Sequence, residues 1–207
     1  MEKRCIAFAC RYFLLWMGKI RTGKSLWLLL GFLALALPLR WMAAAAVSIA
    51  VHELCHYLAV RLCGGQVYSL YMTAGGIKMH TSPLTPGKHL ICALAGPAGG
   101  LLLFLLSIKM PRLALCALVH SAWNLLPLYP LDGGRAVENL LVLVFPYRGE
   151  RIFLWLQRFF FFAVVLACLW ASFLKHLGIL PLLVAFALLI KSDFLKNPCK
   201  DARPAVQ

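Results

Sequence analysis

The residues best suited to chemistry lie in the segment His52–His56, which reads His-Glu-Leu-Cys-His. Residues four apart lie one above the other on a helix, so the two imidazoles can bind one zinc ion. Glu53 projects beside that face and can accept a proton from a metal-bound water. A lone histidine in an apolar helix is often a contact between helices, but two at this spacing with a carboxylate between them are hard to explain as packing.

A catalytic zinc site has a third protein ligand and an open position, and Asp132 is the candidate for that ligand. It is one of only seven acidic residues and stands at the edge of an apolar segment, where a charged side chain costs at least about 2.5–3.5 kcal/mol. Pro127 and Pro130 cannot continue a regular helix, so the chain should unwind just before Asp132, and the glycines after it permit a tight turn and a new helix. The alternative is an aspartate that only caps a helix.

The elements that must position these residues are apolar. Hydrophobic residues make up 62% of the chain and charged residues 14%, and the mean hydropathy is +0.83, which predicts an all-α polytopic membrane protein. The net charge of +14 lies in short loops and tails between apolar runs. This pattern is typical of membrane flanks that meet the lipid bilayer and argues against nucleic-acid binding.

About six transmembrane helices are expected, each needing roughly 20 apolar residues. The candidate spans are 25–39, 41–62, 89–108, 112–128, 152–174 and 177–192. With both termini cytoplasmic, most Lys and Arg fall inside, which satisfies the positive-inside rule. This topology puts His52 and His56 in the inner half of the second span and Asp132 just after the inner end of the fourth, at matching depth.

The rest of the chain divides around this membrane unit. We expect a cytoplasmic or interfacial segment over 1–24, with an interfacial helix over about 5–20. A membrane domain that carries the candidate zinc site should follow over 25–194, and a short cytoplasmic tail over 195–207. No removable signal peptide is apparent. The glycine-punctuated stretch 64–88 contains two short β-prone runs; a membrane-edge β-hairpin and an ordinary cytoplasmic loop both fit it.

Together, the His52–His56 motif and the Asn124…Pro127…Leu131-Asp132-Gly133 stretch resemble the site-2 protease family of intramembrane zinc metalloproteases. In detail the chain resembles the sporulation branch, typified by stage IV sporulation protein FB. The resemblance covers roughly residues 45–140. It implies one zinc per chain held by His52, His56 and Asp132, with Glu53 as general base and acid. It also implies that Asn124 holds substrate backbone or the oxyanion.

The resemblance extends to further features. The run 95–100 (Ala-Gly-Pro-Ala-Gly-Gly) fits the small-residue motif of the family, with Gly100 where asparagine is common. The segment 64–80 resembles the hairpin that pairs with unwound substrate. Expected partners are a membrane-tethered protein such as a pro-sigma or anti-sigma factor, remnant signal peptides, and a membrane inhibitor protein. Compared with the family, no PDZ-like insertion is apparent between the expected spans, and the short tail is not expected to form the nucleotide-sensing domain of the sporulation relatives.

Other interpretations remain open at this stage. The same His and Asp residues could form a metal or proton pathway in a transporter, although no second copy of either motif is present. An inactive metal-binding scaffold is a third possibility, but it would have no need of Glu53. His120 is either a residue supporting the metal ligands or a polar contact between helices. Glu138 is either an alternative ligand or a solvated helix residue.

Overall fold

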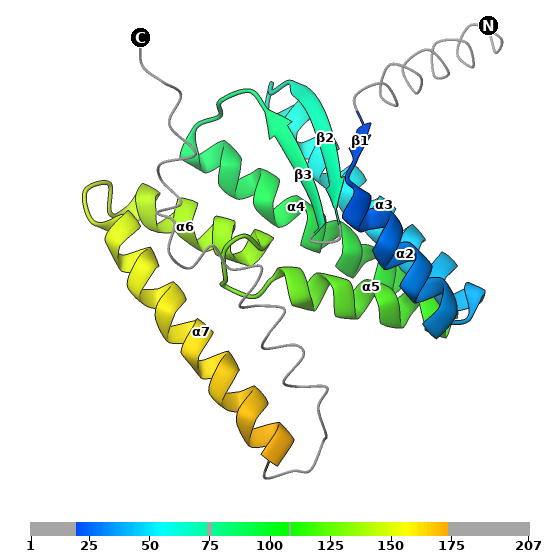
Figure 1. The fold of residues 1–207 in the computed structure, drawn as a ribbon. Coiled ribbons are helices and arrows are strands. Elements are labelled where there is room, and N and C mark those ends of the chain that lie inside the picture. Colours follow the sequence, from blue (N-terminus) through cyan, green and yellow to red (C-terminus); the bar gives the residue numbers. More distant parts are fainter. Residues whose placement is uncertain (1–19, 74–75, 108, 174–207) are drawn as a thin grey trace, which may run out of the picture.

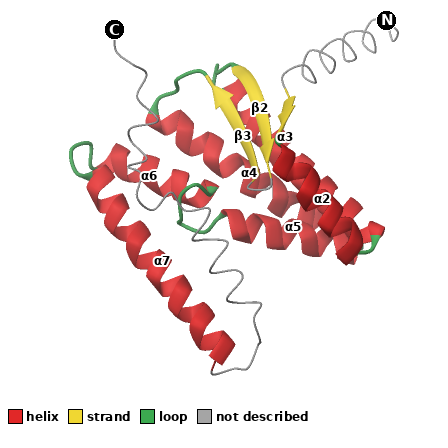
Figure 2. Ribbon diagram, viewed as in Figure 1, coloured by secondary structure: helices red, strands yellow, loops and turns green. Residues whose placement is uncertain are grey.

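The computed structural model describes residues 20–73, 76–107 and 109–173 (Figure 1). Three predictions lie wholly or almost wholly outside these residues: the interfacial helix over 5–20, the last span over 177–192 and the tail over 195–207. Within them the chain is mostly helical, as predicted, with a small sheet (Figure 2). The helices are α2 (Lys24–Ala36), α3 (Leu39–Leu62), α4 (Pro86–Leu106), α5 (Pro111–Asn124), α6 (Asp132–Val144) and α7 (Gly149–Phe173).

The sheet contains the predicted hairpin and one strand that was not predicted. β2 (Val67–Thr73) and β3 (Gly76–Thr81) pair antiparallel, which confirms the hairpin over the loop interpretation. β1 (Ile20–Thr22) pairs parallel with β2 on its other side, so the order is β1-β2-β3. Val67 and Leu70 of β2 are buried with Ala59, Val60 and Cys92, and this cluster fixes the sheet to α3 and α4.

α4 is the central helix of the bundle. It packs against α3, α5 and α6, and α7 packs against α6 (Figure 1). α3 also packs against α5. Because α3 carries the His52–His56 motif and α6 begins at Asp132, α4 brings the two candidate ligand-bearing elements to the same place.

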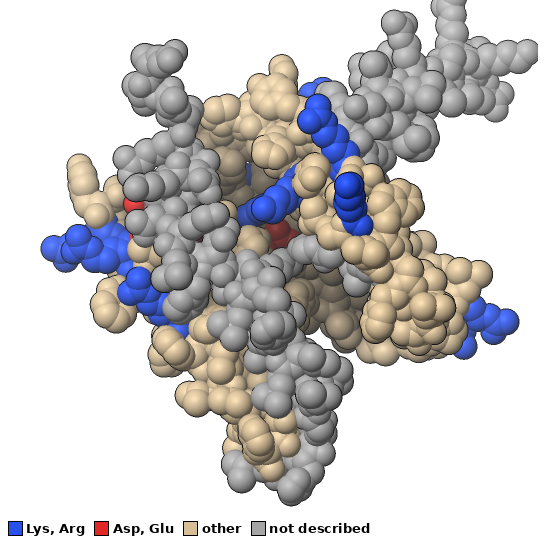
Figure 3. All heavy atoms as spheres, in the orientation of Figure 1, with Lys and Arg blue, Asp and Glu red and all other residues tan. Residues whose placement is uncertain are grey.

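In the part of the chain that the structure describes, three helices are long and apolar enough to cross a membrane: α3, α4 and α7. This indicates a multi-pass membrane protein. Many of their large apolar side chains are exposed, and on the face in Figure 3 much of the described surface is uncharged. The fourth expected span, 112–128, is shorter than predicted because α5 ends at Asn124. Its 14 residues are about 21 Å long, less than a hydrocarbon core.

α5 ends early for a local reason. Pro127 has no N–H to donate back to Trp123 in a continued helix. The N–H of Leu126 instead donates to the Trp123 carbonyl oxygen over 3.3 Å, and the N–H of Leu128 donates to that of Leu126 over 2.7 Å. These tight turns replace the helix, so the prediction that the chain unwinds before Asp132 is confirmed.

Candidate metal centre

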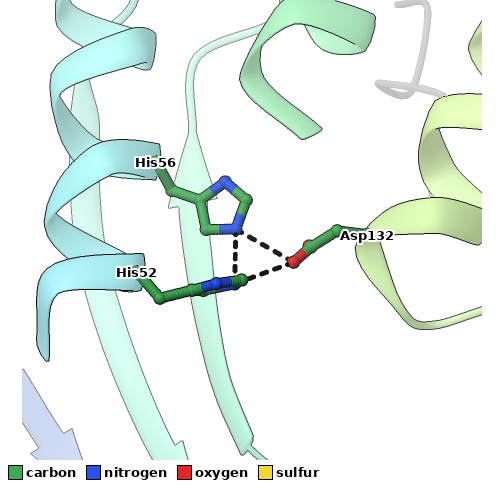
Figure 4. A group of neighbouring side chains, drawn as sticks. All are labelled: His52, His56 and Asp132. Atoms are coloured by element: carbon green, nitrogen blue, oxygen red, sulfur yellow. Dashed lines mark hydrogen bonds and ion pairs between the residues drawn. The ribbon is translucent and has the colours of Figure 1, made fainter. Parts of the chain in front are cut away.

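His52 and His56 lie one turn apart on α3 and face the same way, as their spacing predicts (Figure 4). Their ring centroids are 4.7 Å apart and the ring planes are inclined by 78°. The two Nε2 atoms are 3.1 Å apart. His52 is only 2% exposed, so α3 delivers one fully buried imidazole and one partly buried imidazole to a common point.

Asp132 is the first residue of α6, and its carboxylate points at both imidazoles (Figure 4). Its Oδ2 atom lies 2.9 Å from His52 Nε2 and 3.0 Å from His56 Nε2. The N-cap position of α6 belongs to Leu131, and no side chain caps that helix. The interpretation of Asp132 as a capping residue is therefore wrong.

Two glycines allow the irregular segment before Asp132 to fold back on the first turn of α6. A Cβ atom on Gly133 would overlap the carbonyl oxygen of Leu125, and one on Gly134 would lie 2.5 Å from the carbonyl carbon of Leu128. Both contacts are with backbone, which cannot rotate away as a side chain can. The position of Asp132 therefore depends on the absence of side chains at the next two residues.

The protonation of His56 is set by a backbone carbonyl. His56 Nδ1 lies 2.7 Å from the Cys92 carbonyl oxygen on α4. A carbonyl only accepts, so Nδ1 carries the hydrogen and donates it. In a neutral imidazole Nε2 then presents a lone pair, here directed at Asp132 Oδ2 and His52 Nε2.

This convergence of three electron-rich atoms fits a bound cation. A single proton can join two of the three atoms, whereas a metal ion can accept all three. Tetrahedral zinc with ligands at about 2.0–2.1 Å holds them about 3.3 Å apart. The observed separations of 2.9, 3.0 and 3.1 Å differ from this by a few tenths of an ångström. Histidine nitrogens and a carboxylate oxygen are ordinary zinc ligands, so the residues present fit the metal.

The predicted small-residue run on α4 makes room for this site. A Cβ atom on Gly96 would overlap the His56 ring, and one on Gly99 would overlap Cys55 Sγ. On the side facing α5, a Cβ on Gly100 would overlap Ser121 Oγ. The close helix approach expected at Gly100 is thus present, and Gly96 is the glycine that touches a candidate ligand.

Glu53 lies within electrostatic range of both histidines, Asp132 and Arg135. Its neighbours therefore include all three candidate ligands, which suits a base acting on a water at the metal. Arg135, on the first turn of α6, was treated in the sequence only as a flanking charge. The structure places it near the site.

Asn124 is the last residue of α5, and its side-chain nitrogen donates to the His120 carbonyl oxygen over 3.0 Å. That bond is local to α5 and does not link Asn124 to the three candidate ligands. The His120 ring instead packs on His52, with centroids 4.5 Å apart. This contact joins α5 to α3 and is made to a candidate ligand, so it fits both interpretations of His120, as a contact between helices and as a support of the metal ligands.

Glu138 stands apart from the metal cluster, which among the described residues consists of His52, His56 and Asp132. It lies on α6, a helix that is not one of the candidate spans. Burial raises the pKa of its carboxyl group, the nearby Glu150 raises it further, and Arg135 opposes both. Neither sequence interpretation describes it well, because it is half-buried and outside the cluster.

Comparisons with known proteins agree with this geometry. The fold matches the solved structure of the site-2 protease from Methanocaldococcus jannaschii, with a TM-score of 0.61 over 91% of this chain and 92% of that one. The identity is 18%, so the likeness shows a shared fold. No family model matches the chain.

A curated relative adds a sequence similarity. The protein sll0528 of Synechocystis sp., whose name describes it provisionally as a zinc metalloprotease, is 28% identical over 177 residues. The match covers 76% of this chain but 45% of that protein, so the chain spans about half the length of this relative. Together the comparisons show the fold of the site-2 protease and a sequence similarity to a protein described as a zinc metalloprotease.

Sequence reasoning missed the features that come from backbone or from packing. The hydrogen bond from His56 uses the backbone carbonyl oxygen of Cys92, which the identity of residue 92 does not reveal. The contact between Gly96 and His56 depends on how α3 packs against α4. The only available signal was the small-residue run on α4, which indicates close approach without identifying the partner.

Proposed function

We propose that this protein is an intramembrane zinc metalloprotease that hydrolyses peptide bonds of membrane-embedded or membrane-associated proteins near the cytoplasmic face. The observation that carries the proposal is the buried group of His52, His56 and Asp132, whose three donor atoms converge while His56 is held by a backbone carbonyl. In an apolar helix bundle such a group is expensive to bury and is expected to be functional.

In this mechanism His52, His56 and Asp132 would hold one zinc, which would supply Lewis-acid polarisation of the scissile carbonyl and a lowered pKa for the attacking water. Glu53 takes the proton of that water and later returns it to the leaving amine. Asn124 binds the substrate backbone or the developing oxyanion beside the metal. This role requires the Asn124 amide to give up or share its hydrogen bond with the His120 carbonyl oxygen.

The sheet offers a place for an unwound substrate. β3 is one of the two edge strands in the order β1-β2-β3 of the described sheet. The backbone donors and acceptors on its outer edge can pair with another strand. A substrate helix keeps its amides hydrogen-bonded and hidden, so it must unwind before cleavage. Pairing of the extended substrate with β3, at the membrane edge, would stabilise that state by strand addition.

The proposed membrane arrangement keeps six spans with both termini cytoplasmic. α3, α4 and α7 meet the length requirement, and α2 and α5 would cross as shorter or partly buried helices. The sixth span would come from residues 177–192. The Lys and Arg distribution in the sequence supports this orientation.

The substrate class follows from the resemblance to the sporulation branch. A membrane-bound pro-sigma factor, a membrane-tethered anti-sigma factor and remnant signal peptides are the candidates, which would make the enzyme part of regulated intramembrane proteolysis. A membrane inhibitor protein would be its regulator.

The test uses full-length protein purified in detergent, with zinc content and cleavage of a transmembrane substrate measured for each variant. Wild type should contain one zinc and cut. Glu53→Gln should keep zinc and lose about 10²–10⁴ in rate, the usual contribution of a general base. Asp132→Ala should lose both zinc and cleavage. Glu150→Gln, which makes the same change at an exposed site on α7, is the matched control.

Two outcomes would overturn the proposal. One is a well-folded wild type without zinc, and the other is a Glu53→Gln variant that cuts as fast as wild type. Zinc flux by wild type in proteoliposomes, unaffected by Glu53→Gln, would favour the transporter alternative.

A further inference from the structure

The two histidines of the metal centre differ in what holds their second ring nitrogen. His56 Nδ1 donates to the Cys92 carbonyl oxygen. His52 Nδ1 is buried and has no hydrogen-bond partner among the residues that the structure describes. A metal-binding histidine almost always donates this second N–H to a carboxylate, a carbonyl or a water, which fixes its tautomer and orientation. His52 therefore needs an acceptor.

A suitable acceptor lies one turn earlier on the same helix. Ser48 is 1% exposed, and within the described part of the chain its Oγ atom likewise has no partner. Side chains on a helix lean toward its N-terminus, so the His52 ring lies over the turn that carries Ser48. An unsatisfied donor and an unsatisfied acceptor thus occupy neighbouring positions on one face of α3.

The surroundings of His52 limit the other ways to satisfy it. The His120 ring packs at 4.5 Å between centroids, and the His56 ring packs at 4.7 Å in an edge-on arrangement. With 2% exposure, His52 has almost no access to bulk solvent. A buried N–H left without an acceptor is costly. Among the described residues of α3, the Ser48 hydroxyl is the polar side chain one turn away on the same face, and it can serve directly or through a trapped water that it helps to hold.

We propose that Ser48 is a positioning residue for the metal centre. Its hydroxyl accepts the hydrogen of His52 Nδ1, directly after rotation of the side chain or through one trapped water. This holds the tautomer in which the Nε2 lone pair of His52 points at the metal. The inference rests on the proposed function, because it assigns Ser48 a role only if zinc binds between His52, His56 and Asp132.

The experiment measures zinc affinity by chelator competition, and thermal stability with and without zinc, for wild type and Ser48→Ala in detergent. Zinc should bind about 10- to 100-fold more weakly to Ser48→Ala, the usual effect of losing such a support. The loss of thermal stability should be larger with zinc than without it, because in the metal-free protein His52 Nε2 can donate to Asp132 Oδ2 over 2.9 Å, and the Nδ1 of a neutral ring then carries no hydrogen for Ser48 to accept. A merely structural role would instead destabilise both forms equally.

Ser121→Ala is the matched control. Ser121 is 0% exposed, its hydroxyl also lacks a partner in the described residues, and it lies against Gly100 on α4. It should leave zinc affinity within about twofold of wild type. A second readout is the visible spectrum of the cobalt-substituted protein, which reports ligand geometry: Ser48→Ala should change it and Ser121→Ala should not.

The outcomes separate this inference from the function on which it rests. If wild type binds zinc and Ser48→Ala binds it equally well with the same cobalt spectrum, the role of Ser48 is overturned while the metal centre stands. Equal weakening by Ser121→Ala would also overturn it, since the effect would then be one of general packing. If wild type binds no zinc, the proposed function fails and this inference fails with it.

Discussion

The candidate ligands converge, but they are positioned by two different kinds of structure, a regular helix and an irregular segment. His52 and His56 lie on α3, an uninterrupted helix of 24 residues, so their relation is set by local hydrogen bonds at every turn. Asp132 follows the irregular segment Leu125–Leu131, in which short turns replace the helix. The same coordination group thus joins a regular element to an irregular one.

The difference lies in what fixes each ligand. The irregular segment is held by packing, because Leu128 and Leu131 are buried against Phe161 of α7, and by the backbone contact at Gly133. No repeating hydrogen bonds restore its shape after a disturbance. We therefore expect Asp132 to be more easily displaced than either histidine, and glycine substitutions on the two sides test this.

The largest effect is expected for Gly133→Ala. Its Cβ atom would overlap the Leu125 carbonyl oxygen, so the segment before Asp132 must move away. Zinc affinity should fall by more than about a hundredfold, beyond the range for loss of a supporting contact, because a ligand itself is displaced. Chelator competition measures this in the purified protein.

Gly87→Ala provides the control for the Gly133 prediction. At Gly87 an added Cβ would meet only Leu143 Cδ1, at 4.0 Å, so zinc affinity should be unchanged. Wild-type zinc affinity in Gly133→Ala would show that the irregular segment adapts. Asp132 would then be no more easily displaced than the two histidines.

A smaller effect is expected for Gly96→Ala, on the helical side. Here the added Cβ overlaps the His56 ring, a side chain on a rigid helix that can shift slightly while its backbone stays in place. Zinc affinity should fall about tenfold, comparable with the loss of a supporting contact. The same titration measures it.

Gly99→Ala is matched to Gly96→Ala because it lies on the same helix and its Cβ overlaps Cys55, which is not a candidate ligand. It should affect zinc binding less than Gly96→Ala does. Equal losses would mean that the spacing between α3 and α4 matters, and not the His56 ring. A larger loss of zinc affinity in Gly96→Ala than in Gly133→Ala would mean that the histidines on the helix are more easily displaced than Asp132.

The same contrast explains how far the sequence could be interpreted. The pairing of His52 with His56 follows from helical spacing, and the break before Asp132 follows from Pro127 and Pro130, so both could be predicted. The hairpin also carried local signals in its glycines and β-prone runs. These features depend on residues close together in the chain.

What escaped prediction depends on contacts between distant segments. β1 pairs with β2 across about fifty residues, and a three-residue strand has no pattern of its own. The contact of His56 with Cys92 uses a backbone oxygen, which every residue has. The burial of Ser48 depends on the helices that pack against α3, so a serine in an apolar run gave no sign of a role.

The smallest effect is expected in α6 beyond Asp132. It concerns the contribution of that helix to the stability of the fold, and not zinc binding. Burial raises the pKa of Glu138 above its usual value near 4.5, Glu150 raises it further, and Arg135 lowers it. An acid with a raised pKa in the folded state binds more protons there than in the unfolded state. Stability is therefore lost as pH rises from about 4.5 through the folded pKa.

Glu138→Gln removes this titration. In the metal-free protein, its melting temperature should exceed that of wild type by about 2 °C at pH 7, the scale of a sub-kilocalorie change in a chain of this size. The difference should vanish below pH 4.5. Thermal melts across pH 4–8 measure this difference in melting temperature. Glu150→Gln should also raise the melting temperature at pH 7, since that substitution removes the charge next to Glu138. A Glu138→Gln variant that is less stable than wild type at pH 7 would mean that favourable contacts stabilise the Glu138 carboxylate. Charged side chains would then stabilise α6, whereas the irregular segment before it is stabilised by packing.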